Sequence, residues 1–379
     1  MRAPRLTTLA DVLCRYSLQV GEGDTVLVDG PPVAQPLIVE MVRKVTELGA
    51  HPMVRTRLER AQAAFLANAS DAQLQTVTRL DEIEVEAPTR ALSIWAQRNN
   101  RFASGIDPNR QAIRSAATRP LFERFFDREA RGEVRWCGTA FPCDSAAQDA
   151  GMSLIEWEDF VYSAGHLLDH DPIEFWRAQS ARQDQVVAQL QSVGELRILG
   201  ADTDLTLDVS GRTWVNADGH QNFPDGEVFT SPVETATRGH ITFSLDAPYN
   251  GNDVTGVRLW FEQGRVVREE AVKGGPFLRQ MLDMDAGARY LGEVAFGMND
   301  EIRTGTRDTL FDEKIGGTCH VALGMGFPEA GGSNRSGLHW DMVCDLRSGG
   351  EIHADGEPIY RDGAFLPSFF AGDLGAPAV

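Results

Sequence analysis

The sequence predicts an α/β plus α+β fold, with an α/β domain built on a parallel sheet at residues 1–194 and a β-rich domain at residues 195–379. Two observations lead to this prediction. In the first half, short apolar runs alternate with amphipathic helical runs, the order that builds a parallel sheet. The second half holds 27 of the 37 glycines, and its short alternating runs between glycines are typical of β-strands joined by turns.

The first strand is expected at residues 25–28, where an apolar run ends at Asp29-Gly30. A helix follows, and Gly49 is a natural residue to end it. A second strand at 53–57 completes a strand–helix–strand unit, which implies a parallel pair with a right-handed crossover. Further strands are expected at 91–96 and 134–139. The helix has its apolar residues at spacings of 4, 4 and 3, on one face: Leu37, Met41, Val45 and Leu48.

A long helix is expected from Asp171 to Gly194. Pro172 lies in its first turn and Glu174 lies three residues after the cap, an arrangement that favours a helix start. The character of the chain changes after Gly194, so the domain boundary is placed near residue 195. Strands in the second domain are expected at 205–209, 240–244, 256–262 and 351–360.

The chain is acidic, with 36 Lys plus Arg against 55 Asp plus Glu and a formal charge of −19. A nucleic-acid-binding surface needs clustered cations to displace counterions, so this class of partner is excluded. Only three of the cations are lysines, Lys44, Lys273 and Lys314. None of the three lies in a recognisable site for Schiff-base chemistry.

The composition also bears on the compartment. Asp11 and Arg15 interrupt the N-terminal run, so no signal-peptide core is expected, and no apolar run is long enough to span a membrane. The five cysteines are odd in number and scattered, which argues against a disulfide framework. We therefore expect a cytoplasmic protein without a membrane partner.

Two motifs in the first half resemble functional sites. Asp29-Gly30 after a strand resembles a nucleotide-binding turn, but Pro31-Pro32 follows where glycines are required. His166 and His170 would share a helix face, but the glutamate of a zinc-protease H-E-x-x-H motif is missing. We therefore interpret the histidines as surface or capping groups.

The second half offers better candidates for metal ligands. His339 and Asp341 are two residues apart in a strand-like run, so their side chains point to the same face. Such a pair either binds a divalent metal or forms a buried hydrogen bond. His320, Glu293 and Glu227 also lie in apolar surroundings. Because a carboxylate is rarely buried without a partner, these residues together favour a shared metal site.

These segments resemble the thermophilic-type metalloaminopeptidases, the group that contains aminopeptidase T, aminopeptidase S and PepS. The resemblance covers essentially the whole chain, and its most specific part lies at residues 222–345. It implies metal-ligand roles for six residues, with their motifs: Glu227 in NFPDGEVFTSP, Glu293 as the bridging ligand in LGEVAFG, Glu313 in TLFDE, His320 in CHVALG, and His339 and Asp341 in SGLHWDMV.

The resemblance further implies two divalent ions, which could be zinc, cobalt, manganese or magnesium, and a metal-activated water that attacks a peptide bond. The substrate would be a peptide with a free N-terminus, and Glu293 or Glu313 would accept the proton of the water. A homodimer is also implied.

The sequence departs from the family pattern at two points. Phe327 stands where the family has a tyrosine, which removes a donor that could stabilise an oxyanion. Glu313 and His320 are also seven residues apart, more than the usual interval. Alternatives therefore stay open: an aminohydrolase acting on an aminated aromatic acid, a ring-cleaving non-haem iron dioxygenase, or a metal-binding protein without catalysis.

Overall fold

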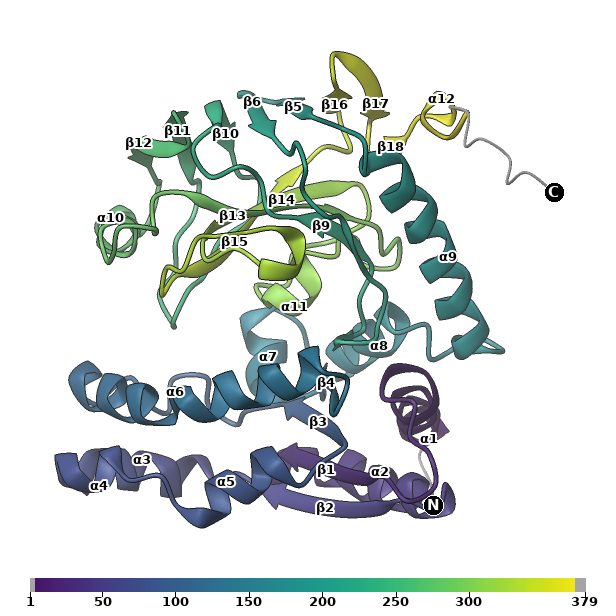
Figure 1. The fold of residues 1–379 in the computed structure, drawn as a ribbon, viewed down its shortest axis with the longest axis vertical. Helices are drawn as coiled ribbons and strands as arrows, with labels where there is room; N and C mark the ends of the chain where they lie inside the picture. Colours follow the sequence, from purple (N-terminus) through teal and green to yellow (C-terminus); the bar gives the residue numbers. More distant parts are fainter. Residues whose placement is uncertain (1–3, 372–379) are drawn as a thin grey trace. The chain divides into compact units, whose positions relative to one another are not determined.

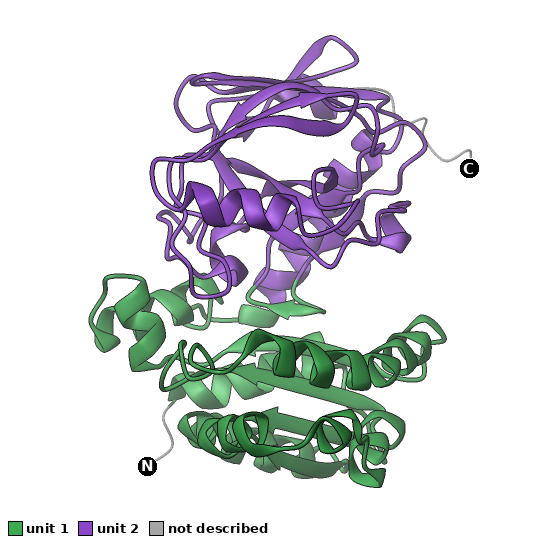
Figure 2. Ribbon diagram, turned by 90° about the vertical axis from the view of Figure 1, so that its left-hand side faces the viewer, with its two compact units in different colours: residues 1–173, 219–224 green, residues 174–218, 225–379 purple. Residues whose placement is uncertain are grey.

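The computed structural model describes residues 4–371, and Figure 1 shows their helices and strands. The chain divides into two compact units (Figure 2). The first runs to Ile173 and includes Gly219–Pro224, and the second comprises Glu174–Asp218 and the chain from Asp225 onward. The first unit has a parallel sheet and the second is rich in antiparallel strands, so the predicted fold class is confirmed.

The first unit contains a five-stranded sheet in the order β2-β1-β3-β4-β8, and every neighbouring pair is parallel. Its strands are β1 (Thr25–Gly30), β2 (His51–Thr56), β3 (Arg90–Trp95), β4 (Arg135–Ala140) and β8 (Asn222–Phe223). Its longer helices are α1 (Pro4–Val12), α2 (Gln35–Glu47), α3 (Glu59–Asn68), α5 (Arg79–Glu86), α6 (Pro108–Ala130) and α8 (Leu154–Ala164). Short elements complete the unit: η1 (Leu13–Ser17), η2 (Pro32–Ala34), α4 (Asp71–Gln75) and α7 (Asp144–Asp149).

The expected strand–helix–strand unit is present as β1, α2 and β2. Leu37, Met41 and Val45 on the predicted apolar face of α2 are all fully buried. The strand expected at residues 53–57 begins earlier, at His51, because its ladder with β1 starts at the pair Thr25–His51. The apolar periodicity predicted these elements because one face of α2 is buried and because β1 and β2 form a parallel ladder.

The second unit contains two antiparallel sheets. The eight-stranded sheet comprises β12 (Arg265–Glu270), β11 (Arg258–Glu262), β10 (Arg238–Thr242), β6 (Thr203–Asp208), β5 (Glu195–Gly200), β16 (Glu351–Ala354), β17 (Glu357–Arg361) and β18 (Ala364–Phe365). The five-stranded sheet comprises β15 (His339–Asp345), β14 (Thr318–Gly324), β13 (Leu291–Gly297), β9 (Glu227–Thr230) and β7 (Val215–Ala217). The remaining elements are α9 (Pro172–Leu190), α10 (Gly275–Leu282), α11 (Thr309–Asp312), η3 (Pro328–Ala330) and α12 (Pro367–Phe370).

One hydrophobic cluster joins residues of both sheets and forms the main core of this unit. On β14, Val321 and Leu323 enter the core, whereas His320 and Ala322 project from the opposite face. The five-stranded sheet therefore presents one apolar face to the core and a second face to a site. A slip of one residue would exchange the two faces, so core packing fixes which side chains reach the site.

The compact units divide near residue 173 and again around Gly219–Pro224, whereas the sequence predicted one boundary near residue 195. The helix expected from Asp171 to Gly194 is α9, which ends at Leu190. Val186 and Leu190 of this helix belong to the core of the second unit. The segment around Asn222 adds β8 to the parallel sheet, where it pairs with Gly138. Neither feature has a local sequence signal.

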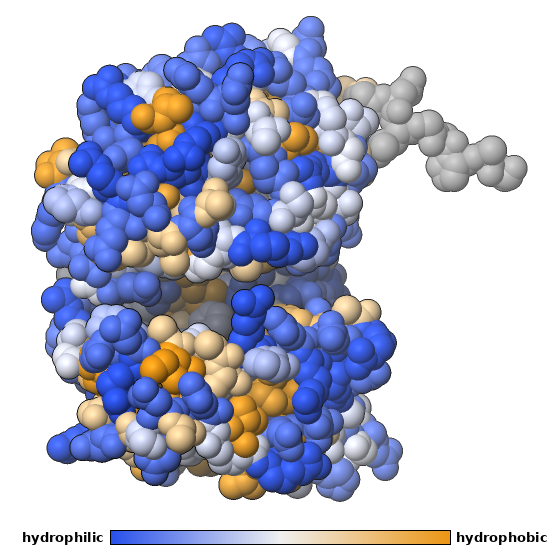
Figure 3. Space-filling view, turned by 60° about the vertical axis from the view of Figure 1, so that its left-hand side comes forward, coloured by the Kyte–Doolittle hydropathy of each residue, from blue (hydrophilic) through white to orange (hydrophobic). Residues whose placement is uncertain are grey.

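Polar side chains cover most of the face shown in Figure 3, and apolar side chains gather there in small patches. Such scattered apolar exposure is normal for a folded protein. Within residues 4–371, none of the helices combines the length and the apolar character that a membrane span requires.

The turn between β11 and β12 depends on a glycine. Gly264 has φ +80°, and a Cβ there would lie 1.8 Å from the carbonyl oxygen of Glu234. We predict that Gly264→Ala lowers the free energy of unfolding by about 1–3 kcal/mol more than Gly349→Ala. Gly349 is the matched control because it has φ +71° with open space around its Cβ position. Equal losses in urea unfolding would contradict the steric argument.

Candidate metal centre

Five of the six predicted metal ligands lie on the site face of the five-stranded sheet: Glu227, Glu293, His320, His339 and Asp341. Ala322 of β14 pairs with Glu293 of β13 on one side and with Asp341 of β15 on the other. His320 precedes Ala322 by two residues and therefore projects to the same face. Because Ala322 is small, the side chains on either side of it can converge above the sheet. Glu227, the first residue of β9, reaches the same place.

The candidate ligand atoms face one another at 3.4–3.6 Å, longer than a typical hydrogen bond of about 2.7–3.2 Å. His320 Nε2 lies 3.6 Å from Glu227 Oε2 and 3.6 Å from Glu293 Oε1. His339 Nε2 lies 3.4 Å from Glu293 Oε2 and 3.5 Å from Asp341 Oδ1. Ligands bound to one ion at about 2.0–2.2 Å in tetrahedral geometry are separated by about 3.3–3.6 Å. The spacing therefore fits atoms arranged around cations.

Hydrogen bonds fix the orientation of both imidazoles. His320 Nδ1 lies 3.1 Å from the carbonyl oxygen of Glu313, and His339 Nδ1 lies 3.0 Å from that of Met325. A carbonyl oxygen can only accept, so each Nδ1 carries the proton and each Nε2 of the neutral ring presents a lone pair. This second hydrogen bond is the usual support of a metal-binding histidine.

Three buried atoms in the cluster have no hydrogen-bond partner: His320 Nε2, Glu227 Oε2 and Asp341 Oδ1. A buried polar atom without a partner is costly, and here the three atoms point toward shared space. Divalent cations would satisfy all of them. The residues present therefore fit a metal site by their donor types, their separations and their unpaired atoms.

Without metal, the pKa values of His320 and Glu313 are raised, so both groups bind protons more readily than usual. Burial lowers the pKa of His320, but the facing carboxylates of Glu293 and Glu227 outweigh burial and raise it to about 9. Burial raises the pKa of Glu313 to about 7, against the opposing effect of Lys314. Without metal, bound protons partly neutralise the buried carboxylates.

Glu313 reaches the cluster from a loop and not from a strand. It follows the short helix α11, whose first turn is capped by Asp308 through the Leu310 amide. Its carboxylate forms a further group with His320 and Asp341, in which the ligand atoms lie within 4.8 Å of one another. The longer interval between Glu313 and His320 therefore still brings the carboxylate to the site.

The family model described as thermophilic metalloprotease, M29, matches residues 2–365 of this sequence. The chain belongs to the M29 family. It is 26% identical over 408 residues to aminopeptidase 2 of Geobacillus stearothermophilus, covering 94% of this chain and 97% of that protein. It is 31% identical over 259 residues to aminopeptidase T of Thermus thermophilus, covering 61% of each.

The solved structure of wild-type AmpT from Thermus thermophilus has a similar fold, with a TM-score of 0.82 at 24% identity. The match covers 96% of this chain and 99% of that one. The resemblance stated from the motifs is thus confirmed, as is the expectation of a metal-dependent hydrolase. The M29 assignment rests on sequence, and the structural match adds the fold.

Lys314 is a site residue that was not predicted from the sequence, although it is one of only three lysines. Lys314 is fully buried, and its Nζ lies 2.7 Å from Glu227 Oε1 and 3.5 Å from Asp225 Oδ1. It also forms an ion pair with Glu313. The ammonium binds one oxygen of Glu227 and leaves the other directed at His320. Its position directly after Glu313, a predicted acidic ligand, was the sequence signal that could have identified it.

Phe327 lies beside the cluster on the turn after β14. Its ring centroid is 5.2 Å from that of His339 in an edge-on contact and 5.1 Å from that of Phe229. Its amide donates to Ser231 Oγ at 2.9 Å. An apolar ring edge therefore lies next to a proposed metal ligand.

The two motifs set aside in the first half have structural roles. Asp29 accepts a hydrogen bond from Arg57 Nε at 2.8 Å. His166 lies after the end of α8 with φ +54°, and its Nδ1 lies 3.0 Å from Asp169 Oδ2. His166 and His170 are therefore not on one helix face.

We predict that Lys314→Met destabilises the metal-free protein by about 3–5 kcal/mol, because it leaves buried carboxylates without their cation. Lys273→Met is the matched control: Lys273 pairs with Asp253 at 2.7 Å, but its side chain is 63% exposed. An exposed pair of this kind contributes about 0–1 kcal/mol. Chemical denaturation after exhaustive chelation measures both, and equal losses would contradict a stabilising role for Lys314.

Proposed function

We propose that this M29 enzyme is an aminopeptidase that releases N-terminal residues from peptides with a water activated between two divalent ions. The observation that supports two ions is that Glu293 belongs to two ligand groups. One group is Glu227, Glu293 and His320, and the other is Glu293, His339 and Asp341. Oxygen Oε1 of Glu293 faces His320 and Oε2 faces His339, as a bridging carboxylate requires.

The buried charges also favour two ions. Within residues 4–371, Lys314 is the buried cation that accompanies five carboxylates around the cluster: Asp225, Glu227, Glu293, Glu313 and Asp341. With neutral histidines, two divalent ions would bring this buried set to neutrality. Such ions, zinc, cobalt, manganese or magnesium, would lower the pKa of a shared water and polarise the scissile carbonyl.

We assign proton transfer to Glu313. Both oxygens of Glu293 face histidines, so this residue is engaged as a ligand. Glu313 lies close to His320 and Asp341, and one of its oxygens pairs with Lys314. Its second oxygen can accept the proton of the attacking water and return it to the leaving amine.

The relatives support peptide substrates, since several of them are named aminopeptidases. A free N-terminal amine suits the site because an acidic cluster attracts a protonated amine. The homodimer and the cytoplasmic location stay predictions. Light scattering of the purified protein measures the first.

A second candidate is hydrolysis of an aminated aromatic acid. The Phe327 ring lies against His339 and the Phe229 ring lies against Phe327, and such aromatic rings could stack on an aromatic substrate. Rapid turnover of an aminated aromatic acid, without release of arylamine from any aminoacyl-arylamide, would favour this candidate over the aminopeptidase. One bound iron per chain would instead indicate ring cleavage.

We predict two divalent ions per chain in the purified protein, measured by elemental analysis. Chelation should abolish release of arylamine from aminoacyl-arylamides, and one of the four metals should restore it. Glu293→Gln should lower the metal content to one ion or fewer, because it weakens both ligand groups. Glu301→Gln is the control, because Glu301 lies 3.8 Å from Arg303 and belongs to none of the ligand groups. This variant should bind two ions. Full occupancy in Glu293→Gln would argue against a bridging role.

We predict that Phe327→Tyr raises kcat for aminoacyl-arylamides by up to about 10²-fold, the effect of one added oxyanion donor. Phe327→Leu is the control, because it changes the ring without adding a hydroxyl and should give no increase. Steady-state kinetics at saturating metal compare the three proteins. If Phe327→Tyr matches the parent enzyme, the absent hydroxyl does not limit the rate.

A further inference from the structure

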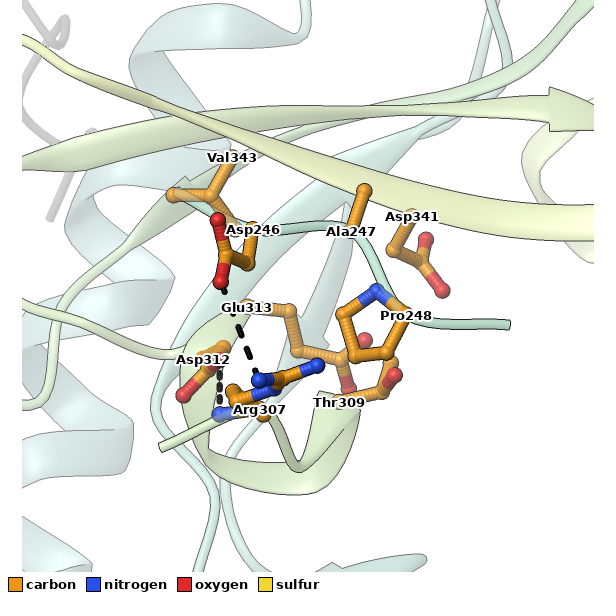
Figure 4. Close-up of a pocket in the computed structure, with 9 residues that line it drawn as sticks. All are labelled: Asp246, Ala247, Pro248, Arg307, Thr309, Asp312, Glu313, Asp341 and Val343. Carbon is orange, nitrogen blue, oxygen red and sulfur yellow. Dashed lines mark hydrogen bonds and ion pairs between the residues drawn. The ribbon is translucent and has the colours of Figure 1, made fainter. Parts of the chain in front are cut away.

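A pocket opens beside the metal cluster, with Glu313 and Asp341 in its wall (Figure 4). Another part of the wall is apolar and comes from Ala247, Pro248 and Val343. In the proposed aminopeptidase reaction, the scissile carbonyl lies at the cluster. The pocket is small and open to solvent, so the end of a short bound peptide can lie at its mouth.

The acidic side chains that line this pocket differ in whether they are free to contact a ligand. Glu313 and Asp341 belong to the metal cluster. Asp312 is buried and already accepts three hydrogen bonds, from the Thr306 amide at 2.6 Å, the Thr306 hydroxyl at 2.7 Å and the Arg307 amide at 2.8 Å. Its carboxylate therefore supports the loop. Asp246 and Arg307 remain as the charged groups that a ligand can meet.

Arg307 is the one cation among the residues that line this pocket. Its backbone has φ +67°, a conformation that costs a non-glycine residue about 1–2 kcal/mol and persists only where the surroundings impose it. The hydrogen bond from its amide to Asp312 helps to hold this conformation. The loop at residues 306–308 thus holds the backbone of Arg307 in place. Because α11 follows this loop directly, the loop also positions Glu313 at the end of α11.

The guanidinium of Arg307 has N–H donors that its hydrogen bond to Asp253 does not use. It pairs with one oxygen of Asp253, whose other oxygen binds Lys273 at 2.7 Å. Asp246 lies 4.0 Å from Arg307 Nη1, beyond a hydrogen bond (Figure 4). A guanidinium has five N–H donors in a planar fork that matches a carboxylate. The side chain is 35% exposed, so a ligand can reach it.

We propose that Arg307 binds the C-terminal carboxylate of a short peptide substrate, so that this pocket selects peptides whose free carboxyl end lies close to the scissile bond. The inference rests on the proposed aminopeptidase function. Binding the α-carboxylate there would place the peptide between two fixed points, the metal cluster at its first residue and Arg307 at its end. Without Arg307, the carboxylates of Asp246 and Asp312 would repel such a substrate.

The test compares short peptides with their C-terminal amides, for example Leu-Gly and Leu-Gly-Gly as free acids and as amides. The wild-type enzyme should prefer the better-fitting free acid by about 10- to 100-fold in kcat/KM, the range for hydrogen bonds to a charged group. Arg307→Met should reduce this preference to near unity, mainly through KM, and should leave hydrolysis of the amides within about twofold. Arg307→Lys should keep part of the preference.

Arg303→Met is the matched control, because the Arg303 side chain is 74% exposed, lies 3.8 Å from Glu301 and donates from Nε to the carbonyl oxygen of Asp300 at 3.2 Å, outside the pocket lining. It should retain the wild-type preference. Arg307→Met keeps the amide that Asp312 accepts, so unchanged hydrolysis of the amides reports an intact loop. An acid preference that is absent from the wild type, or equal in wild type and Arg307→Met, would overturn the inference.

Failure of the proposed function would look different, since the wild type would then cleave neither acids nor amides. In that case, calorimetric titration of the same acids and amides into the protein as purified, with its metals, tests the pocket without catalysis. Tighter binding of the acid that is lost in Arg307→Met supports the site. Equal binding of acid and amide to the wild type excludes it.

Discussion

Five carboxylates converge above one face of the five-stranded sheet, and they can remain together only if cations lie between them. Lys314 is the internal cation, in contact with Asp225, Glu227 and Glu313. The other side of the cluster has two imidazoles whose Nε2 atoms face carboxylate oxygens. Charge balance therefore links the fold of this unit to metal binding, because an incomplete set of cations leaves buried charge uncompensated.

The two-faced sheet makes this convergence possible. Alternate residues of β13, β14 and β15 pack into the core with the eight-stranded sheet, so the residues between them must face the site. Small side chains such as Ala322 and Ala295 occupy the middle of that face. Larger residues there would separate Glu293 from His320 and Asp341. Core packing on one face of the sheet thus determines where the candidate ligands lie on the other face.

Around this centre, two side chains bear on substrate choice. Phe327 places an apolar ring edge against His339. Arg307 places a guanidinium in the pocket beside Glu313 and Asp341. The first lies close to the proposed reacting atoms and offers no hydrogen bond, whereas the second offers N–H donors further along the proposed substrate.

Much of the fold could be predicted from the sequence because periodicity is a local property. The burial of Leu37, Met41 and Val45 on one face of α2 followed from their spacing, and His339 and Asp341 project together because a strand repeats every two residues. Segment 219–224 joins the parallel sheet, and α9 belongs to the second unit. Both depend on partners far away in the chain, which no window of sequence contains.

The sequence by itself determined the residue types of the site, their order along the chain and, through their motifs, the M29 family. It also showed an acidic chain with three lysines. Only the tertiary structure decided that one of those lysines is fully buried among the candidate ligands, and that Arg307 shares a pocket with two of them. The reason is physical: ligand types are chemical properties of single residues, whereas charge compensation and pocket walls arise from contacts between distant segments.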